Sequence, residues 1–172
     1  MNPMQNIRIE KVTLNVGAGK STDVLDKGVK LLTNITGRTP VRTITQKRIA
    51  QWGIRPGLSV GAKVTLRGDQ ATQILKRLLQ AKDNQLSPKQ CDDHGNVSFG
   101  IPEYIDIPDT KYDPEIGIMG FEVAVTLSRP GFRVKKRRLK RSKIGKNHQI
   151  RQEETIAFLK EQFQVSFDED ES

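Results

Sequence analysis

Nine basic residues and no acid occupy one short internal stretch of this 172-residue chain. These residues are Arg133, Lys135, Lys136, Arg137, Arg138, Lys140, Arg141, Lys143 and Lys146. A block of like charge repels itself and does not fold unaided. For an isolated run, a solvated tail or a localisation signal would be as good an interpretation. Here the block lies between an apolar strand pattern and a helical pattern, so it requires a counter-ion, which a phosphate backbone supplies.

The overall charge also favours a polyanionic partner. The chain has 29 Lys and Arg against 20 Asp and Glu, which gives a net charge of +9 and a pI near 9.8. Four of the acids lie in residues 168–172, so residues 1–167 carry 29 bases against 16 acids, a net +13. The lone cysteine, Cys91, indicates a reducing, cytoplasmic compartment. The apolar runs are too short for a membrane span, and no signal peptide is evident.

A glycine-lysine-serine motif, Gly19-Lys20-Ser21, lies between a predicted strand and a predicted helix, where the phosphate loop of an NTPase would end. That loop needs another glycine five positions before Gly19, and the chain has Leu14 there. An NTPase that uses Lys20 is therefore not expected. The backbone N–H groups at this helix start could still hold one RNA phosphate.

The other enzyme-like motifs also lack their structural context. Ser59 lies in a G-x-S-x-G pattern that enters a strand instead of a helix, and neither His94 nor His148 is an evident base for it. Acids follow Cys91 and raise the pKa of a thiol, and tandem Cys, Asp and His residues make a poor metal site. We therefore expect no catalytic residues, no metal and no cofactor.

Strand and helix patterns alternate along the chain. The predicted strands are residues 7–16, 41–45, 60–67, 97–101, 104–107 and 121–128. One helix is capped by Ser21 or Thr22 and ends at Gly37, and a second is capped by Asp69. A third helix follows the basic block, and residues 83–96 are predicted to be polar turns. These elements predict a two-layer α+β domain, with a mainly antiparallel sheet covered by helices on one face.

The opposite face of that sheet is predicted to be open to solvent or to a ligand. Alternation places hydrogen-bonding and cationic side chains there, which suit phosphate, ribose and base edges. They are Lys11, Thr13, Asn15, Lys63, Thr65 and Arg67. None of these six side chains is a carboxylate, so we expect a face without negative charge. An ordinary solvated face would mix both signs of charge. The sequence therefore favours RNA binding through this face.

Residues 46–59 are basic, contain glycine and lack periodicity, so a loop is predicted there. The loop holds the only tryptophan of the chain, Trp52, together with Lys47, Arg48 and Arg55. An exposed tryptophan requires a partner, so it either packs on its own domain or stacks on nucleic acid. The cationic neighbours slightly favour stacking on a partner.

Several segments in a fixed order resemble the large-subunit ribosomal protein five family, in its archaeal and eukaryotic branch. They are KVTLNVGAGKS, TGRTPVRT, QKRIAQWGIRPG, VGAKVTLRG, GNVSFGIPEYID and YDPEIGIMGFEVAVTLSRPGF, followed by the basic run. The resemblance spans about residues 4–167. It implies a single RNA-binding domain over residues 1–167, with a protruding loop at 46–59 and a basic extension at 133–151. The acidic tail, residues 168–172, has no counterpart and no assigned role.

In that family the open sheet face grips 5S rRNA in the central protuberance of the large ribosomal subunit. The resemblance places this function on Asn15, Gly17, Thr45, Gln46, Lys63, Thr65 and Arg67. It also implies that residues 46–57, with Lys47, Arg48, Trp52 and Arg55, reach tRNA in the P site, and that the basic segment lies in large-subunit rRNA. Neighbouring ribosomal proteins would be further partners.

The function expected from the sequence is binding, not turnover: a structural protein of the large ribosomal subunit, in the cytoplasm. A free-standing RNA chaperone or rRNA-processing factor on the same fold is the alternative. Such a factor would bind many RNAs with similar affinity and sediment away from large subunits.

Overall fold

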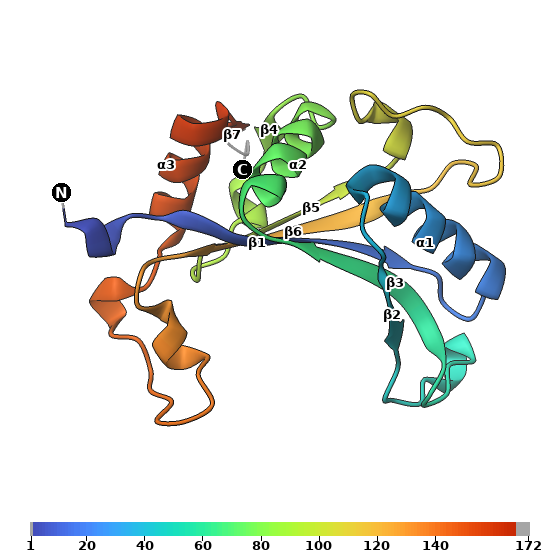
Figure 1. Cartoon of the computed structure of the whole chain (residues 1–172), viewed down its shortest axis with the longest axis horizontal. Coiled ribbons are helices and arrows are strands. Elements are labelled where there is room, and N and C mark those ends of the chain that lie inside the picture. The colour runs from blue at the N-terminus through green and yellow to red at the C-terminus, as the bar shows by residue number, and fades with distance from the viewer. Residues whose placement is uncertain (1, 168–172) are drawn as a thin grey trace. The chain divides into compact units, whose positions relative to one another are not determined.

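The computed structural model describes residues 2–167 (Figure 1). Three α-helices lie within them: α1 (Thr22–Thr36), α2 (Asp69–Gln80) and α3 (Gln152–Phe163). The strands are β1 (Arg8–Gly17), β2 (Val41–Ile44), β3 (Ser59–Leu66), β4 (Gln85–Leu86), β5 (Asn96–Ile101), β6 (Phe121–Ser128) and β7 (Ser166–Phe167). A five-stranded sheet has the order β2-β3-β1-β6-β5, and β4 pairs in parallel with β7. The predicted α+β class with a mainly antiparallel sheet is confirmed.

The described residues divide into two compact units, each assembled from separate segments. Unit 1 comprises residues 2–12, 67–98 and 125–167, and unit 2 comprises residues 13–66 and 99–124. Strands β1, β5 and β6 contribute residues to both units. The single domain expected over residues 1–167 stays a prediction. The predicted acidic tail, residues 168–172, lies outside the described residues.

In unit 2, helix α1 packs on β3 (Figure 1). The Ser21 hydroxyl accepts a hydrogen bond from the Val24 N–H at the start of α1, and Gly37 ends the helix in the left-handed conformation, as predicted. The apolar stripe of the helix is buried, and so is the inward-facing Leu14 of β1. A side chain at Gly28 would place its Cβ 2.8 Å from Val16 Cγ1, so glycine permits this close packing of α1.

Strand β2 pairs with β3 in an antiparallel register that fixes which side chains share a side. Val41 lies opposite Lys63, and Thr43 lies opposite Gly61. A Cβ at Gly61 would lie 2.5 Å from the carbonyl oxygen of Val16, so this position of β3 accepts only glycine without a backbone shift. These pairs place Lys63 on the side of the sheet away from the buried Ala62.

In unit 1, helix α2 buries the predicted stripe, but its start differs from the expectation. Gly68 is the N-cap, with a φ of 63°, and Asp69 is the first helical residue instead of the cap. Glycine reaches this backbone angle at little cost, and it forms no side-chain cap hydrogen bond. The stripe consists of Ala71, Ile74, Leu75, Leu78 and Leu79.

Two short segments were predicted wrongly. Residues 83–96 were expected to be polar turns, but they contain β4, with Leu86 buried, and the buried Cys91. Tyr104 was expected in a strand and instead begins a 3-10 helix, Tyr104–Asp106, where its hydroxyl accepts a hydrogen bond from the Asp113 N–H at 2.8 Å. Segments of two to four residues are too short to show a period, so only their distant partners fix their conformation.

None of the helices in residues 2–167 has the length and apolar character to cross a membrane.

Candidate nucleic-acid interface

The outward side of the sheet in unit 2 is exposed. Lys63 and Thr65 on β3 are exposed, and Thr13 and Asn15 on β1 are half-buried. The hydroxyl oxygens of Thr13 and Thr65 lie 3.5 Å apart across the two strands. The structure thus brings four of the predicted site residues together on one polar surface. We call this surface the open face. It consists of these four residues and Glu122 on the neighbouring strand β6.

The expectation that this face carries no carboxylate is wrong. Glu122 on β6 is exposed, and its Oε2 accepts a hydrogen bond from Asn15 Nδ2 at 3.3 Å. The alternation along β6 shows that Glu122 points away from the core. Only the strand order places β6 next to β1, and the sequence does not state that order.

The remaining two residues of the predicted sheet face, Lys11 and Arg67, belong to unit 1. Arg67 forms an ion pair with Glu10, whose carboxylate also binds Lys136 of the basic segment. Burial raises the pKa of Glu10, but hydrogen bonds and attraction from Lys136 and Arg67 outweigh burial and lower it below its ordinary value. Glu10 therefore joins two predicted RNA-binding cations into one cluster, a link that the sequence did not indicate.

Backbone hydrogen bonds join the two arms of the loop between β2 and β3. At its base, Thr45 on the first arm pairs with the second arm: its N–H donates to Leu58 O and its carbonyl accepts from the Gly57 N–H, both at 2.9 Å. Further out, Ile49 and Ile54 form a two-way backbone bridge, and the Ile54 side chain is buried. The loop is therefore a short self-supported projection from unit 2, at the β2–β3 end in Figure 1.

Trp52 lies at the tip of this loop, in the 3-10 helix Ala50–Trp52, and is 66% exposed. Packing of Trp52 on unit 2, the first of the two alternatives for this residue, therefore does not occur. The other predicted loop and strand-end residues are exposed as well, except Thr45, whose hydroxyl hydrogen-bonds the backbone of Lys47. These exposed residues are Gly17, Gln46, Lys47, Arg48 and Arg55.

Arg129 closes the base of the basic segment. It is 6% exposed and donates hydrogen bonds to Gln5 O at 3.1 Å, Gln149 O at 3.2 Å and Glu154 Oε1 at 2.6 Å. The contact with Gln149 joins the two ends of the segment, before and after its basic residues. The sequence did not indicate a role for this residue, because a single arginine next to a basic block carries no sign of burial.

Packing of aromatic rings also joins the two ends of the basic segment at its base. The ring of Phe132 is buried and meets His148 edge-on, with centroids 5.7 Å apart. His148 Nε2 lies 2.9 Å from Pro130 O, and Lys135 Nζ lies 4.6 Å from the centroid of the Phe132 ring. The predicted cations beyond this base are exposed, apart from the half-buried Lys135. The basic segment is therefore a loop that exposes its charged side chains and is held at its base by packed side chains.

Comparison with known proteins shows the family to which the chain belongs. The family described as "Ribosomal protein L5" matches residues 2–55, and the model for the C-terminal part of the same ribosomal protein family matches residues 59–167. The chain belongs to the ribosomal protein L5 family. It is 53% identical to the large ribosomal subunit protein uL5 of Nanoarchaeum equitans, over 95% of this chain and 97% of that protein. It is 47% identical to the protein of the same name from Sulfurisphaera tokodaii, over 96% of this chain and 94% of that protein.

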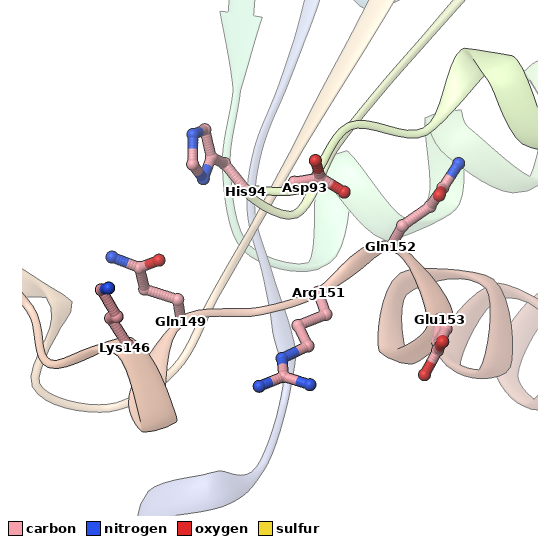
Figure 2. Close-up of a pocket in the computed structure, with 7 residues that line it drawn as sticks. All are labelled: Asp93, His94, Lys146, Gln149, Arg151, Gln152 and Glu153. Atoms are coloured by element: carbon pink, nitrogen blue, oxygen red, sulfur yellow. The ribbon is translucent and has the colours of Figure 1, made fainter.

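Family membership confirms the expectation of a ribosomal protein that is not an enzyme. A pocket of about 480 Å³ lies beside the base of the basic segment. It is lined by both acids and bases, including Asp93, His94 and Glu153. In Figure 2, Asp93 and His94 come from one loop, and Glu153 comes from the first turn of α3.

The enzyme-like motifs of the sequence have structural roles in this L5-family protein. Ser21 caps α1, and Ser59 begins β3. Within residues 2–167, no three metal-binding side chains gather at one place. Asp113 and Glu115, two acids in the loop before β6, form ion pairs with Lys30 of α1; the distance between Lys30 Nζ and the Asp113 carboxylate is 2.8 Å. These acids therefore anchor the loop before β6 to α1.

Cys91 is expected to be unreactive in the folded protein. Burial, and to a lesser extent the nearby Asp92, raises the pKa of its thiol to about 11. At pH 8 the thiolate fraction is then on the order of one in a thousand. We expect Cys91 to react with a disulfide reagent at least ~100-fold more slowly in the folded than in the urea-unfolded protein, followed by absorbance. Equal rates in the two states would contradict this assignment.

Proposed function

We propose that this protein is a structural constituent of the large ribosomal subunit that binds 5S rRNA through the open face of unit 2. The single observation that carries the proposal is the grouping of polar side chains on this face, where the exposed Lys63 and Thr65 lie beside the half-buried Thr13 and Asn15. Hydroxyl and amide groups on a flat strand surface suit ribose and base edges, and Lys63 suits a phosphate. The large-subunit names of its relatives support this setting.

The other two predicted surfaces contribute different contacts. The exposed cations of residues 133–146 bind large-subunit rRNA, since their charge is neutralised best by a phosphate backbone. The β2–β3 loop contacts P-site tRNA with Trp52 and its neighbouring cations. Neighbouring ribosomal proteins of the central protuberance surround the assembled protein, which acts in the cytoplasm.

Thr65→Ala tests the open face directly. We expect it to weaken 5S rRNA binding by about 1–3 kcal/mol, because the RNA group that contacts the hydroxyl loses its partner. The melting temperature should stay unchanged, since Thr65 is exposed. Filter binding and circular dichroism measure the two quantities. Thr33→Ala on α1, an exposed threonine whose hydroxyl bonds Val29 O, is the matched control. Unchanged 5S rRNA binding, or a lowered melting temperature that accounts for the lost binding, would contradict the assignment.

Trp52→Ala tests the loop. Stacking of one base on an aromatic ring is worth about 1–3 kcal/mol, so P-site tRNA binding to ribosomes carrying this variant should weaken by that amount. Binding of 5S rRNA should stay within about twofold, because the Ile49–Ile54 bridge that shapes the loop does not involve the indole. Trp52→Phe keeps an aromatic face and should restore most of the tRNA affinity. Equal tRNA binding by Trp52→Ala and wild type would exclude stacking.

Sedimentation distinguishes the proposed role from that of a free-standing RNA factor. The tagged protein from a cell lysate should sediment with large ribosomal subunits on a sucrose gradient and co-purify with 5S rRNA. A protein that stays at the top of the gradient and binds unrelated RNAs equally well would contradict the proposal.

A further inference from the structure

Glu122 places a negative charge on a surface that is otherwise suited to a polyanion. It stands exposed between Phe121 and Val123, which are buried, so the strand holds its carboxylate on the outward side. The hydrogen-bond partner that the structure gives it is the Asn15 amide and not a cation. A phosphate at this point of the open face would be repelled. The ligand group here must therefore be a hydrogen-bond donor.

The contact with Asn15 makes the site rich in acceptors. A carboxylate only accepts hydrogen bonds, so the Asn15 amide must turn its NH₂ group toward Glu122 Oε2, at 3.3 Å. This orientation leaves Asn15 Oδ1 as an acceptor beside the carboxylate. The two side chains together therefore present oxygen atoms to an incoming group.

Small neighbours leave room for a planar ligand. The next outward residue of β6 is Ala124, and the adjacent strand β5 presents Gly100. Both are exposed, and a Cβ at Gly100 would meet no atom within 4 Å. A glycine within a strand often marks a place where a ligand approaches closely. A nucleobase bound at Glu122 therefore meets no bulky side chain at Ala124 or Gly100.

Among the four RNA bases, guanine alone offers two adjacent N–H donors on its Watson–Crick edge, N1–H and N2–H. Two parallel N–H donors match the two oxygens of a carboxylate, as in bidentate arginine–carboxylate pairs. Adenine, cytosine and uracil each present an acceptor next to their donor, which the carboxylate repels. Proteins that recognise RNA sequence read such edges on unpaired bases.

We propose that Glu122, oriented by Asn15, binds the Watson–Crick edge of an unpaired guanine in the RNA that covers the open face. This inference rests on the proposed binding of 5S rRNA. It gives the open face a residue that selects one particular base, whereas Thr13, Thr65 and Lys63 suit groups that every nucleotide carries.

Glu122→Gln separates base reading from simple electrostatics, because the two predict opposite signs. Removal of a negative charge should tighten RNA binding if only phosphate attraction matters. Loss of one of the two acceptors should instead weaken binding of the full chain to 5S rRNA by about tenfold. Glu161→Gln on α3, another exposed glutamate, is the matched control and should bind like wild type. Melting temperatures check that both variants fold.

Inosine interference mapping identifies the base. Inosine lacks the N2 amino group, so 5S rRNA with randomly placed inosines should bind wild type poorly when the contacted guanine is replaced. We expect this interference at one unpaired guanine, and its disappearance with Glu122→Gln. Binding by Glu122→Gln that equals or exceeds wild type, or an unchanged interference pattern, would overturn the inference alone. Failure of wild type to bind 5S rRNA would overturn the proposed function and this inference with it.

Discussion

Replacement of Arg129 by alanine is expected to lower the free energy of unfolding by about 3 kcal/mol. The guanidinium is buried and donates to two backbone carbonyls and to Glu154. Its loss leaves Gln5 O and Gln149 O without these donors and opens a cavity at the base of the basic segment. The two ends of that segment then lose the contact that joins them. The expected effect is therefore both a lower stability and a less ordered segment.

Urea unfolding followed by circular dichroism measures the loss, and amide hydrogen exchange of residues 132–150 reports the order of the segment. Arg133→Ala removes an exposed arginine four residues away and should change the stability by less than about 0.5 kcal/mol. Arg129→Lys keeps the charge but cannot reproduce the fork of donors, so an intermediate loss is expected. Wild-type stability of Arg129→Ala would show that these hydrogen bonds contribute nothing net.

The Arg129–Glu154 ion pair also has a pH dependence of known sign. Burial raises the pKa of Glu154, but hydrogen bonds from the Arg151 N–H and from Arg129, with their charges, outweigh burial and lower it below its ordinary value. A lowered carboxylate pKa stabilises the fold at neutral pH, and this contribution is lost as the pH falls through the lowered value. The difference in stability between wild type and Arg129→Ala should therefore shrink in acid.

Neutralisation of four exposed cations in the basic segment is expected to weaken rRNA binding by about 100-fold at 0.15 M salt. The changes are Arg137→Ala, Arg138→Ala, Lys140→Ala and Arg141→Ala. Each phosphate contact contributes about −0.7 to −0.9 to the slope of log affinity against log salt, so the slope should become shallower by about 3. The fold should be retained, since these four side chains are exposed beyond the packed base.

Filter binding to large-subunit rRNA fragments over a range of salt concentrations gives both quantities. A control variant removes the same charge from exposed lysines outside the segment: Lys27, Lys76, Lys111 and Lys160. If the basic segment binds rRNA locally, the control should lose much less affinity and little of the slope. Equal losses in the two variants would mean that only the net charge matters, and the assignment of the segment would be wrong.

Local periodicity determined a large part of this protein. Alternation with a period of two placed Leu14 inward and Thr13, Lys63 and Thr65 outward, because successive side chains of a strand point to opposite sides. The stripe of α2 and the start and end of α1 follow equally local rules of spacing and capping. The basic segment needed only the charges of neighbouring residues in the chain. Family resemblance supplied the expected RNA partner.

Only the tertiary structure decided the features that depend on residues far apart in the chain. Strand order brings Glu122 against Asn15, 107 positions away, and so gives the open face its carboxylate. Chain folding buries Arg129 between Gln5 and Glu154, and it pairs β4 with β7, whose two-residue strands have no period of their own. A sequence pattern reports which side of its own element a residue occupies. It does not report which other element lies beside it, because that depends on packing across the whole chain.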